Sequence, residues 1–296
     1  MRHILILGCG DVGRHVAALW LKQDIAVYGV ARQQESCQAM QAIGVQPIVA
    51  DLDDPSSLKA LPIKDALVYS FTPPPADGVI DQRLRYLLDA ISLDSLPARI
   101  VAISTTGVYG DQGGALINED MPPNPQTDRG RRRLDGENTL RLWGREHQVP
   151  VVILRVGGIY GPGRLPMTRI RNQVPIIEPA LSPRTNRIHV EDLAQVCVAA
   201  ATRGHVDTVY NISDGQDSNM TEYFFTLADA FGLPRPPTVD WQTAEQVMTK
   251  GMLSYLKESR RIDNRRMLKD LDIHLQFPDL QHWLRSIDLE QELKCY

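Results

Sequence analysis

Short apolar runs alternate with amphipathic segments along the first third of the chain, and this alternation limits the folds open to it. Each apolar run is rich in β-branched residues and has the length of a buried strand. These runs are HILILG (3–8), IAVYGVAR (25–32), VQPIVADL (45–52), ALVYSFTPPP (66–75) and RIVAIST (99–105). Strands that alternate with helices in this way form βαβ units with parallel strands. We therefore predict an α/β fold, a doubly wound parallel sheet with helices on both faces.

The second half of the chain continues the pattern with one interruption. A helix is predicted at about 130–147, followed by a sixth strand in PVVILRVGGIYGPG (150–163). The stretch 164–186 is rich in Pro, Arg and Asn and has little periodicity, so we place it outside the sheet. A helix at 189–203 and a strand at 208–213 then return to it.

Composition excludes several classes of function. The net charge is −4, and a protein that mainly binds nucleic acid normally has a basic surface. No stretch approaches the ~20 apolar residues of a membrane span. The four cysteines are scattered without a CxxC pair, which favours reduced thiols in a cytoplasmic protein and indicates no metal site.

A glycine motif, GCGDVG (8–13), joins the first strand to the first helix. Gly8 allows a tight turn, Gly10 leaves room for a pyrophosphate, and Gly13 lets the helix pack closely on the strand. Asp11 and Val12 open the helix, whose N-terminal N–H groups are suited to phosphates. In this context the motif predicts a dinucleotide-binding Rossmann fold.

The ends of the next two strands indicate which dinucleotide is bound. An NAD site usually has an acid at the end of the second strand, where this chain has Ala31. Arg32 could instead pair with a 2′-phosphate, or it is a solvated loop residue. Asp51 and Leu52 are expected beside the adenine, although Asp51 could equally cap the following turn. The sequence favours NADP, with NAD possible.

Four further motifs carry a resemblance to a known family. They are ISTTGVYG (103–110), LRVGGIYGPGR (154–164), RIHVEDLA (187–194) and VYNISDG (209–215). With GCGDVG at the start and ESRRIDNRRMLKDL (258–271) near the end, the chain resembles an extended short-chain dehydrogenase/reductase of the NAD-dependent epimerase/dehydratase family. The resemblance covers nearly the whole chain.

The resemblance implies a division of the chain and a set of roles. A Rossmann domain would comprise residues 1–163 and 187–213, and a smaller substrate lobe residues 164–186 and 214–296. The roles that it implies fall into three groups. Ser70, Phe71 and Thr72 would line the cofactor's diphosphate and ribose; Thr105 would orient the substrate oxygen, with Thr106 beside it; Arg184 and Arg187 would meet a substrate diphosphate, or lie in a solvated loop.

The family also implies a catalytic Y-x-x-x-K, and here the sequence departs from it. Leu134 and Glu137 of RGRRRLDGE fix the register, which places Arg129 in the Tyr position and Arg133 in the Lys position. A guanidinium has a pKa above ~12 and cannot act as an acid/base near neutrality, although Arg133 could still donate to a ribose.

The spacing of the arginines predicts how their side chains are oriented. Residues four apart share a helix face, so we expect Arg129 and Arg133 to point into one pocket. Asp128, Asp135 or a ligand phosphate would lie between the two guanidiniums, and Arg131 and Arg132 would face solvent.

Three functions remain open at this point. The protein is a reductase or epimerase with a relocated acid/base, an enzyme whose arginines bind an anionic substrate, or a sensor without turnover. We predict an NAD(P)-dependent oxidoreductase or epimerase, a monomer or homodimer, acting on a small polar or nucleotide-linked substrate. The alternative is a catalytically silent NADP-binding sensor or regulatory protein.

Overall fold

The computed structural model describes residues 3–296. Its centre is a seven-stranded sheet with the order β12-β7-β5-β4-β1-β2-β3, in which every pairing is parallel. The strands are β1 (Ile4–Leu7), β2 (Val27–Ala31), β3 (Gln46–Val49), β4 (Leu67–Ser70), β5 (Arg99–Thr105), β7 (Val151–Val156) and β12 (Thr208–Ile212). The predicted doubly wound sheet is thus confirmed, and its order reverses between β1 and β4.

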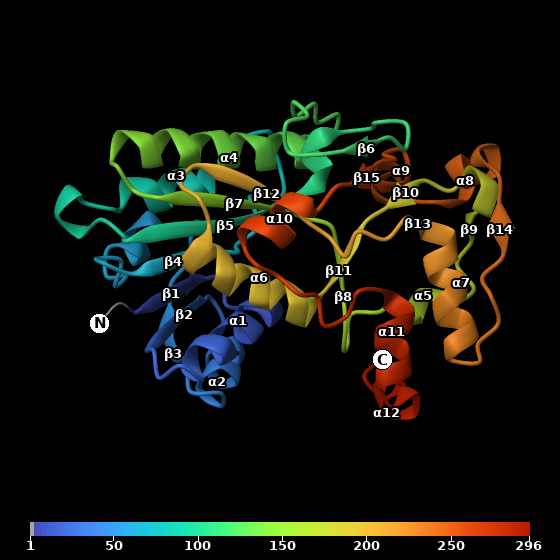
Figure 1. The fold of residues 1–296 in the computed structure, drawn as a ribbon, viewed down its shortest axis with the longest axis horizontal. Helices are drawn as coiled ribbons and strands as arrows, with labels where there is room; N and C mark the ends of the chain where they lie inside the picture. The colour runs from blue at the N-terminus through green and yellow to red at the C-terminus, as the bar shows by residue number, and fades with distance from the viewer. Residues whose placement is uncertain (1–2) are drawn as a thin grey trace.

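Helices cover both faces of this sheet, as Figure 1 shows. One face carries α3 (Gln82–Asp89) and α4 (Asp128–Glu146); the other carries α1 (Asp11–Leu21), α2 (Gln34–Gln41) and α6 (Val190–Arg203). Successive side chains of a strand point to opposite faces. Accordingly, Ile4 and Ile6 of β1 pack in the core on the side of α1, and Leu5 and Leu7 in the core on the side of α3.

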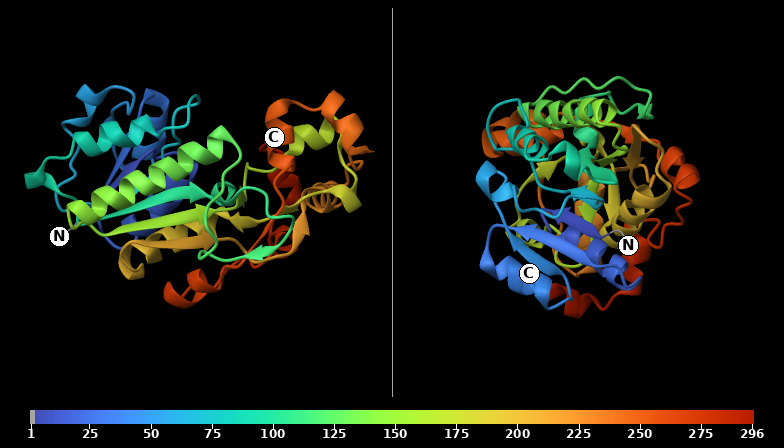
Figure 2. Two further views of the ribbon diagram at one scale, coloured as in Figure 1. Left: turned by 90° about the horizontal axis from the view of Figure 1, so that it is seen from above. Right: turned by 90° about the vertical axis from the view of Figure 1, so that its left-hand side faces the viewer.

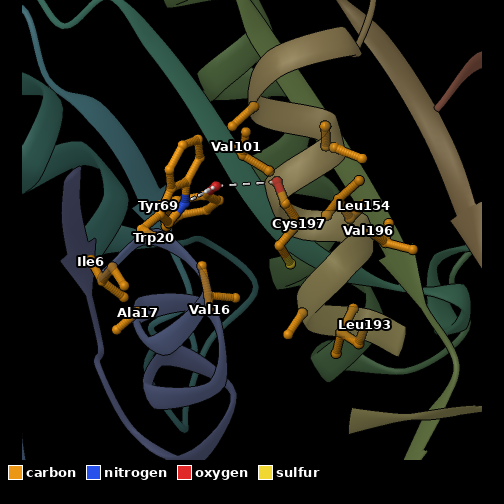
Figure 3. Close-up of a cluster of buried hydrophobic side chains, with 14 of the residues drawn as sticks. Ile6, Val16, Ala17, Trp20, Tyr69, Val101, Leu154, Leu193, Val196 and Cys197 are labelled. Atoms are coloured by element: carbon orange, nitrogen blue, oxygen red, sulfur yellow. Dashed lines mark hydrogen bonds between the residues drawn. The ribbon is translucent and has the colours of Figure 1, made fainter. Parts of the chain in front are cut away.

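A short hydrogen-bond chain crosses the core between α1 and α6 (Figure 3). The indole Nε1 of Trp20 donates to the Tyr69 hydroxyl over 2.9 Å, and that hydroxyl donates to the carbonyl of Cys197 over 3.2 Å. All three residues are buried. Buried polar groups are costly unless they are paired, so this chain satisfies groups that the apolar surroundings would otherwise leave unpaired.

A second group of elements lies beyond the carboxyl ends of the strands (Figures 1 and 2). Its helices are α5 (Met167–Arg171), α7 (Met220–Ala230), α8 (Trp241–Val247), α9 (Lys250–Leu256), α11 (Leu280–Ser286) and α12 (Leu289–Leu293). Four two-stranded pairs lie within this group or between it and the sheet domain: β8 (Gly158–Tyr160) with β11 (Arg187–His189), β9 (Ile176–Ile177) with β14 (Thr238–Val239), β10 (Arg184–Thr185) with β13 (Ser218–Asn219), and β6 (Leu116–Ile117) with β15 (Arg261–Ile262). Phe224 and Trp283 centre its own core.

The chain returns to the sheet before it ends. Helix α10 (Arg265–Asp270) packs Met267 into the core beneath α1 and α6, and Leu271 follows one helical turn later. The predicted division assigns all of 214–296 to the lobe and remains a prediction, but α10 lies on the sheet. None of the helices in residues 3–296 combines the length and the apolar composition that crossing a bilayer requires.

Candidate functional site

The glycine loop after β1 packs against the loop after β4. Gly8 has φ +77°, and a Cβ there would lie 2.8 Å from Thr72 Oγ1, so only glycine fits this close approach. A Cβ on Gly13 would lie 3.2 Å from Ile6 Cγ2, which explains the close packing of α1 on β1. A Cβ on Gly10 would meet nothing within 4 Å, because Gly10 faces an open cavity.

That cavity, of about 490 Å³, lies at the point where the strand order reverses. Open α/β sheets bind ligands at such points. Of the twelve residues predicted for a dinucleotide, the structure brings eleven together on its wall: Gly8, Gly10, Asp11, Val12, Gly13, Arg32, Asp51, Leu52, Phe71, Thr72 and Arg133. Ser70 instead lines a small adjoining cavity, which shares Thr72 and Arg133 with the main one.

Two arginines on the cavity wall are absent from the sequence prediction. Arg83 pairs with Asp53 over 2.6 Å and donates to the Pro73 carbonyl over 3.0 Å, so it holds the loop after β4. Arg164 comes from the loop that follows β8. It is the last residue of the LRVGGIYGPGR motif, and this motif was the only feature of the sequence that could have indicated a place on the cavity wall.

The predicted adenosine end of the cavity carries mixed charge. Arg32 is 61% exposed, and its Nη1 lies 4.0 Å from Asp51 Oδ2. Its guanidinium is therefore accessible to a ligand, and within residues 3–296 it forms an ion pair with Asp51 alone.

Arg133 is positioned on the cavity wall, as predicted. Its guanidinium donates to the Ile103 carbonyl over 3.1 Å. Burial lowers the pKa of Arg133, while the negative charges of Asp81 and Glu137 act in the opposite direction. Since its ordinary pKa is above ~12, it remains a cation near neutrality.

Arg129 does not share this pocket, so the prediction that both guanidiniums point into it is wrong. Helix α4 begins after Thr127, whose hydroxyl accepts from the Gly130 N–H over 3.2 Å. Arg129 thus lies in the first turn, where its guanidinium stacks on Tyr255 of α9 and donates to the Ser254 hydroxyl over 3.4 Å. The aromatic face of the lobe holds the cation in place.

The other residues of the cluster also differ from the prediction. Arg131 is exposed and pairs with Asp128, which confirms the prediction that its side chain faces solvent. Arg132 is buried, contrary to prediction, because the Gly78 carbonyl accepts its Nη1 proton. Asp135 pairs with Arg85 over 2.6 Å, so neither predicted aspartate lies between Arg129 and Arg133.

Thr105 ends β5 and caps the following 3-10 turn (Thr106–Tyr109), its hydroxyl accepting from the Gly107 N–H over 3.1 Å. Thr106 is buried in that turn. Arg184 is bound to Asp217 over 3.1 Å at the surface. Arg187 is buried, with its guanidinium over the Tyr223 ring. These residues are spread along the lobe-facing side of the molecule instead of lining one cavity.

Comparisons with known proteins agree with this architecture. Residues 82–213 match the model of the NAD dependent epimerase/dehydratase family, and residues 4–77 match that of the TrkA-N domain. Protein YeeZ of Escherichia coli K12 is 28% identical, over 94% of this chain and 97% of its own length. The match to the NAD-dependent epimerase/dehydratase family thus covers residues 82–213 of this chain.

Solved structures share the fold of this chain. A conserved protein of unknown function from Silicibacter pomeroyi is 27% identical, with a TM-score of 0.79, over 99% of this chain and 100% of the other. UDP-glucuronic acid 4-epimerase of Bacillus cereus, solved with NAD, is 19% identical with a TM-score of 0.78 over 99% of both chains. At that identity the second match shows the fold alone.

The tyrosines of the ISTTGVYG and LRVGGIYGPGR motifs do not line the cavity. Tyr109 is fully buried and donates to Asn211 Oδ1 over 2.8 Å, and Tyr160 is fully buried near the Phe277 carbonyl. Burial raises the pKa of both phenols, which opposes proton release. Both tyrosines therefore belong to the core of the protein.

Proposed function

We propose that this protein binds NADP or NAD in the cavity between β1 and β4 and transfers hydride to or from a small polar or nucleotide-linked substrate. The observation that carries the proposal is the convergence of eleven predicted dinucleotide residues on one cavity wall. The fold neighbour from B. cereus makes nucleotide sugars the first substrate class to try.

The residues of this wall fit a dinucleotide. Gly10 leaves open space at the start of α1, where helix N–H groups favour a diphosphate. The buried Thr72 hydroxyl has no hydrogen-bond partner within the described residues, and it lies at the same point. When bound, the nicotinamide supplies or accepts the hydride. Arg133, inside the cavity, would donate to the ribose in place of the family's Lys.

Arg32 supports a preference for NADP. It is mostly exposed at the cavity wall, and a 2′-phosphate carries more negative charge than the Asp51 carboxylate that it now faces across 4.0 Å. A charge-assisted contact of this kind contributes about 1.5–3 kcal/mol, which corresponds to roughly tenfold or more in affinity.

Proton transfer needs a group other than Arg129. We assign it to Tyr255, whose ring stacks on Arg129, the residue that the sequence places in the family's Tyr position; in this structure Tyr255 lies on the lobe side, outside the cavity wall. Its helix α9 ends close to the turn after Thr105, because Glu258 Oε2 lies 3.8 Å from the Cβ position of Gly107. Within residues 3–296 the Tyr255 hydroxyl forms no hydrogen bond, so it is free to contact a substrate. Thr105 accepts from Gly107, so its own hydroxyl proton can be donated to a substrate oxygen.

A competing function is a sensor that binds the dinucleotide without turnover. It is favoured by the loss of the family's Tyr, and Arg129 acts as a structural contact between α4 and α9 in that case. A cytoplasmic location and a monomeric or dimeric state also remain predictions; sedimentation of the purified protein tests the second.

One experiment separates these functions. Calorimetry with NADPH and NADH measures binding. Nicotinamide absorbance measures the reduction of ketones and aldehydes by NADPH and the oxidation of UDP-sugars by NADP+ or NAD+, and proton NMR detects UDP-sugars that are epimerised with no net change in the dinucleotide. An enzyme turns over at least one compound, and Tyr255→Phe binds NADPH normally but loses that turnover. Binding without turnover across the panel identifies the sensor, and absence of binding to either dinucleotide overturns both functions.

A further inference from the structure

Arg164 forms an ion pair across the candidate dinucleotide cavity. It follows β8 in the sequence, and its Nη1 reaches the carboxylate of Asp11 in the first turn of α1. Both residues line the cavity. The Arg164 side chain is 28% exposed, while its Nε is buried and has no hydrogen-bond partner within the described residues. This N–H donor is therefore unsatisfied in the present arrangement, and a turn of the side chain could bring it to a ligand.

The backbone on both sides of Arg164 is held by the C-terminal helix. Glu292 Oε1 accepts from the Gly163 N–H over 2.9 Å, and the Tyr296 hydroxyl accepts from the Leu165 N–H over 2.7 Å. Tyr296 in turn donates to Glu292 Oε1 over 2.9 Å. Glu292 is buried, so α12 fixes residues 163–165 through well-shielded bonds.

The Asp11 carboxylate, which Arg164 now contacts, has an unfavourable charge for a phosphate site. The helix N–H groups at Gly10–Gly13 suit a diphosphate, but the Asp11 carboxylate repels one unless a cation compensates it. An arginine placed between a carboxylate and a bound diphosphate can bind either, and its planar guanidinium suits two phosphate oxygens.

We propose that Arg164 is a strap that turns from Asp11 to the diphosphate when the dinucleotide binds, with α12 holding the strap in position. The inference rests on the proposed dinucleotide binding. It assigns Arg164, Glu292 and Tyr296 to affinity for the diphosphate shared by NADP and NAD. It therefore adds no preference between the two dinucleotides, in contrast to Arg32.

Calorimetry with NADPH and NADH on the full chain tests the strap. Arg164→Gln should weaken binding of both dinucleotides about tenfold or more, by the same factor for each. Asp11→Asn should leave binding unchanged or strengthen it, because it removes the competing carboxylate. Tyr296→Phe should weaken binding in the same direction as Arg164→Gln, by a smaller factor.

Arg14→Gln is the matched control. Arg14 lies 3.8 Å from the same Asp11 carboxylate but does not line the cavity, so its loss should change affinity less than about threefold. Arg164 could instead merely tie the lobe to α1. In that case Arg164→Gln and Asp11→Asn would each lower the thermal midpoint of unfolding by a similar amount. A folded Arg164→Gln would then bind NADPH and NADH as tightly as the native protein does.

A folded Arg164→Gln that binds as tightly as the native protein overturns the proposed strap but leaves the proposed dinucleotide binding standing. Weaker binding by Asp11→Asn overturns the strap too, which keeps the test decisive if Arg164→Gln does not fold. A native protein that binds neither dinucleotide overturns the strap and the proposed function together.

Discussion

The guanidinium carbon of Arg129 lies 3.5 Å from the centre of the Tyr255 ring. This stacking joins the first turn of α4, beside the sheet, to α9 in the lobe. Arg129, which the sequence analysis assigns to the family's Tyr position, therefore contacts both parts of the molecule.

The Arg129–Tyr255 contact should contribute measurably to stability. A cation–π pair at a partly exposed site contributes about 0.5–1 kcal/mol. A double-mutant cycle with Arg129→Ala and Tyr255→Leu, read by urea unfolding, should give a coupling energy of that size. Tyr255→Phe should retain the coupling, since it keeps the ring. A cycle that couples Arg131→Ala to Tyr255→Leu is the control, and a coupling as large there would contradict the assignment.

Substitutions of two glycines in the same loop should act differently. Gly10→Val should abolish NADPH binding and leave the fold intact, because its side chain enters open cavity space. Gly13→Val should lower the thermal midpoint, because its Cβ would press on Ile6 across 3.2 Å. Calorimetry and thermal unfolding of both variants provide the check. A folded Gly10→Val that binds NADPH normally would show that the site lies elsewhere.

Arg32→Ala should remove the preference for NADP. We expect the ratio of NADPH to NADH affinity to fall about tenfold, with NADH affinity little changed. Binding isotherms at one salt concentration measure the ratio. Equal or tighter NADH binding by the native protein would contradict the predicted preference.

Removing one partner of the buried Glu137–Arg155 pair should destabilise the protein strongly. Their side chains are 2% and 4% exposed, and Nη2 lies 2.7 Å from Oε2. Glu137→Gln leaves a buried cation without its carboxylate, which costs about 3–5 kcal/mol. Lys257→Ala, which breaks a surface pair with Glu245, should cost less than about 1 kcal/mol in the same urea titration.

Asp214 should make stability fall as the pH rises. Burial raises the pKa of Asp214 from 3.8 to about 7, and the nearby Arg187 opposes the shift only in part. The folded state therefore holds a proton that the unfolded state has lost between about pH 4 and 7, and the stabilisation present below pH 4 is lost through that window. Asp214→Asn should flatten this part of the urea stability profile. An unchanged slope would show that another group is responsible.

The sheet and the glycine loop could be predicted from sequence because both depend on local patterns. Apolar runs at βαβ spacing define the strands. Gly8 and Gly13 each answer a steric requirement of the strand–helix turn, and Gly10 leaves open the space beside it. The contacts that the arginine side chains make could not be predicted in this way. Helical periodicity gives the angle between Arg129 and Arg133, but not that Tyr255 packs on one face of α4 or that the Gly78 carbonyl reaches Arg132. Those partners come from distant segments.

The hydrogen-bond chain from Trp20 through Tyr69 to Cys197 has a consequence for the order in which the protein forms during translation. The helix that follows the glycine loop cannot complete its packing until α6 has left the ribosome. Chains grow at about 5–20 residues per second, so the nascent first helix waits on the order of ten seconds or more. During that interval the apolar face of the first helix is exposed to chaperones. The candidate dinucleotide cavity cannot bind a ligand in that interval either, because its opposite wall has not yet formed.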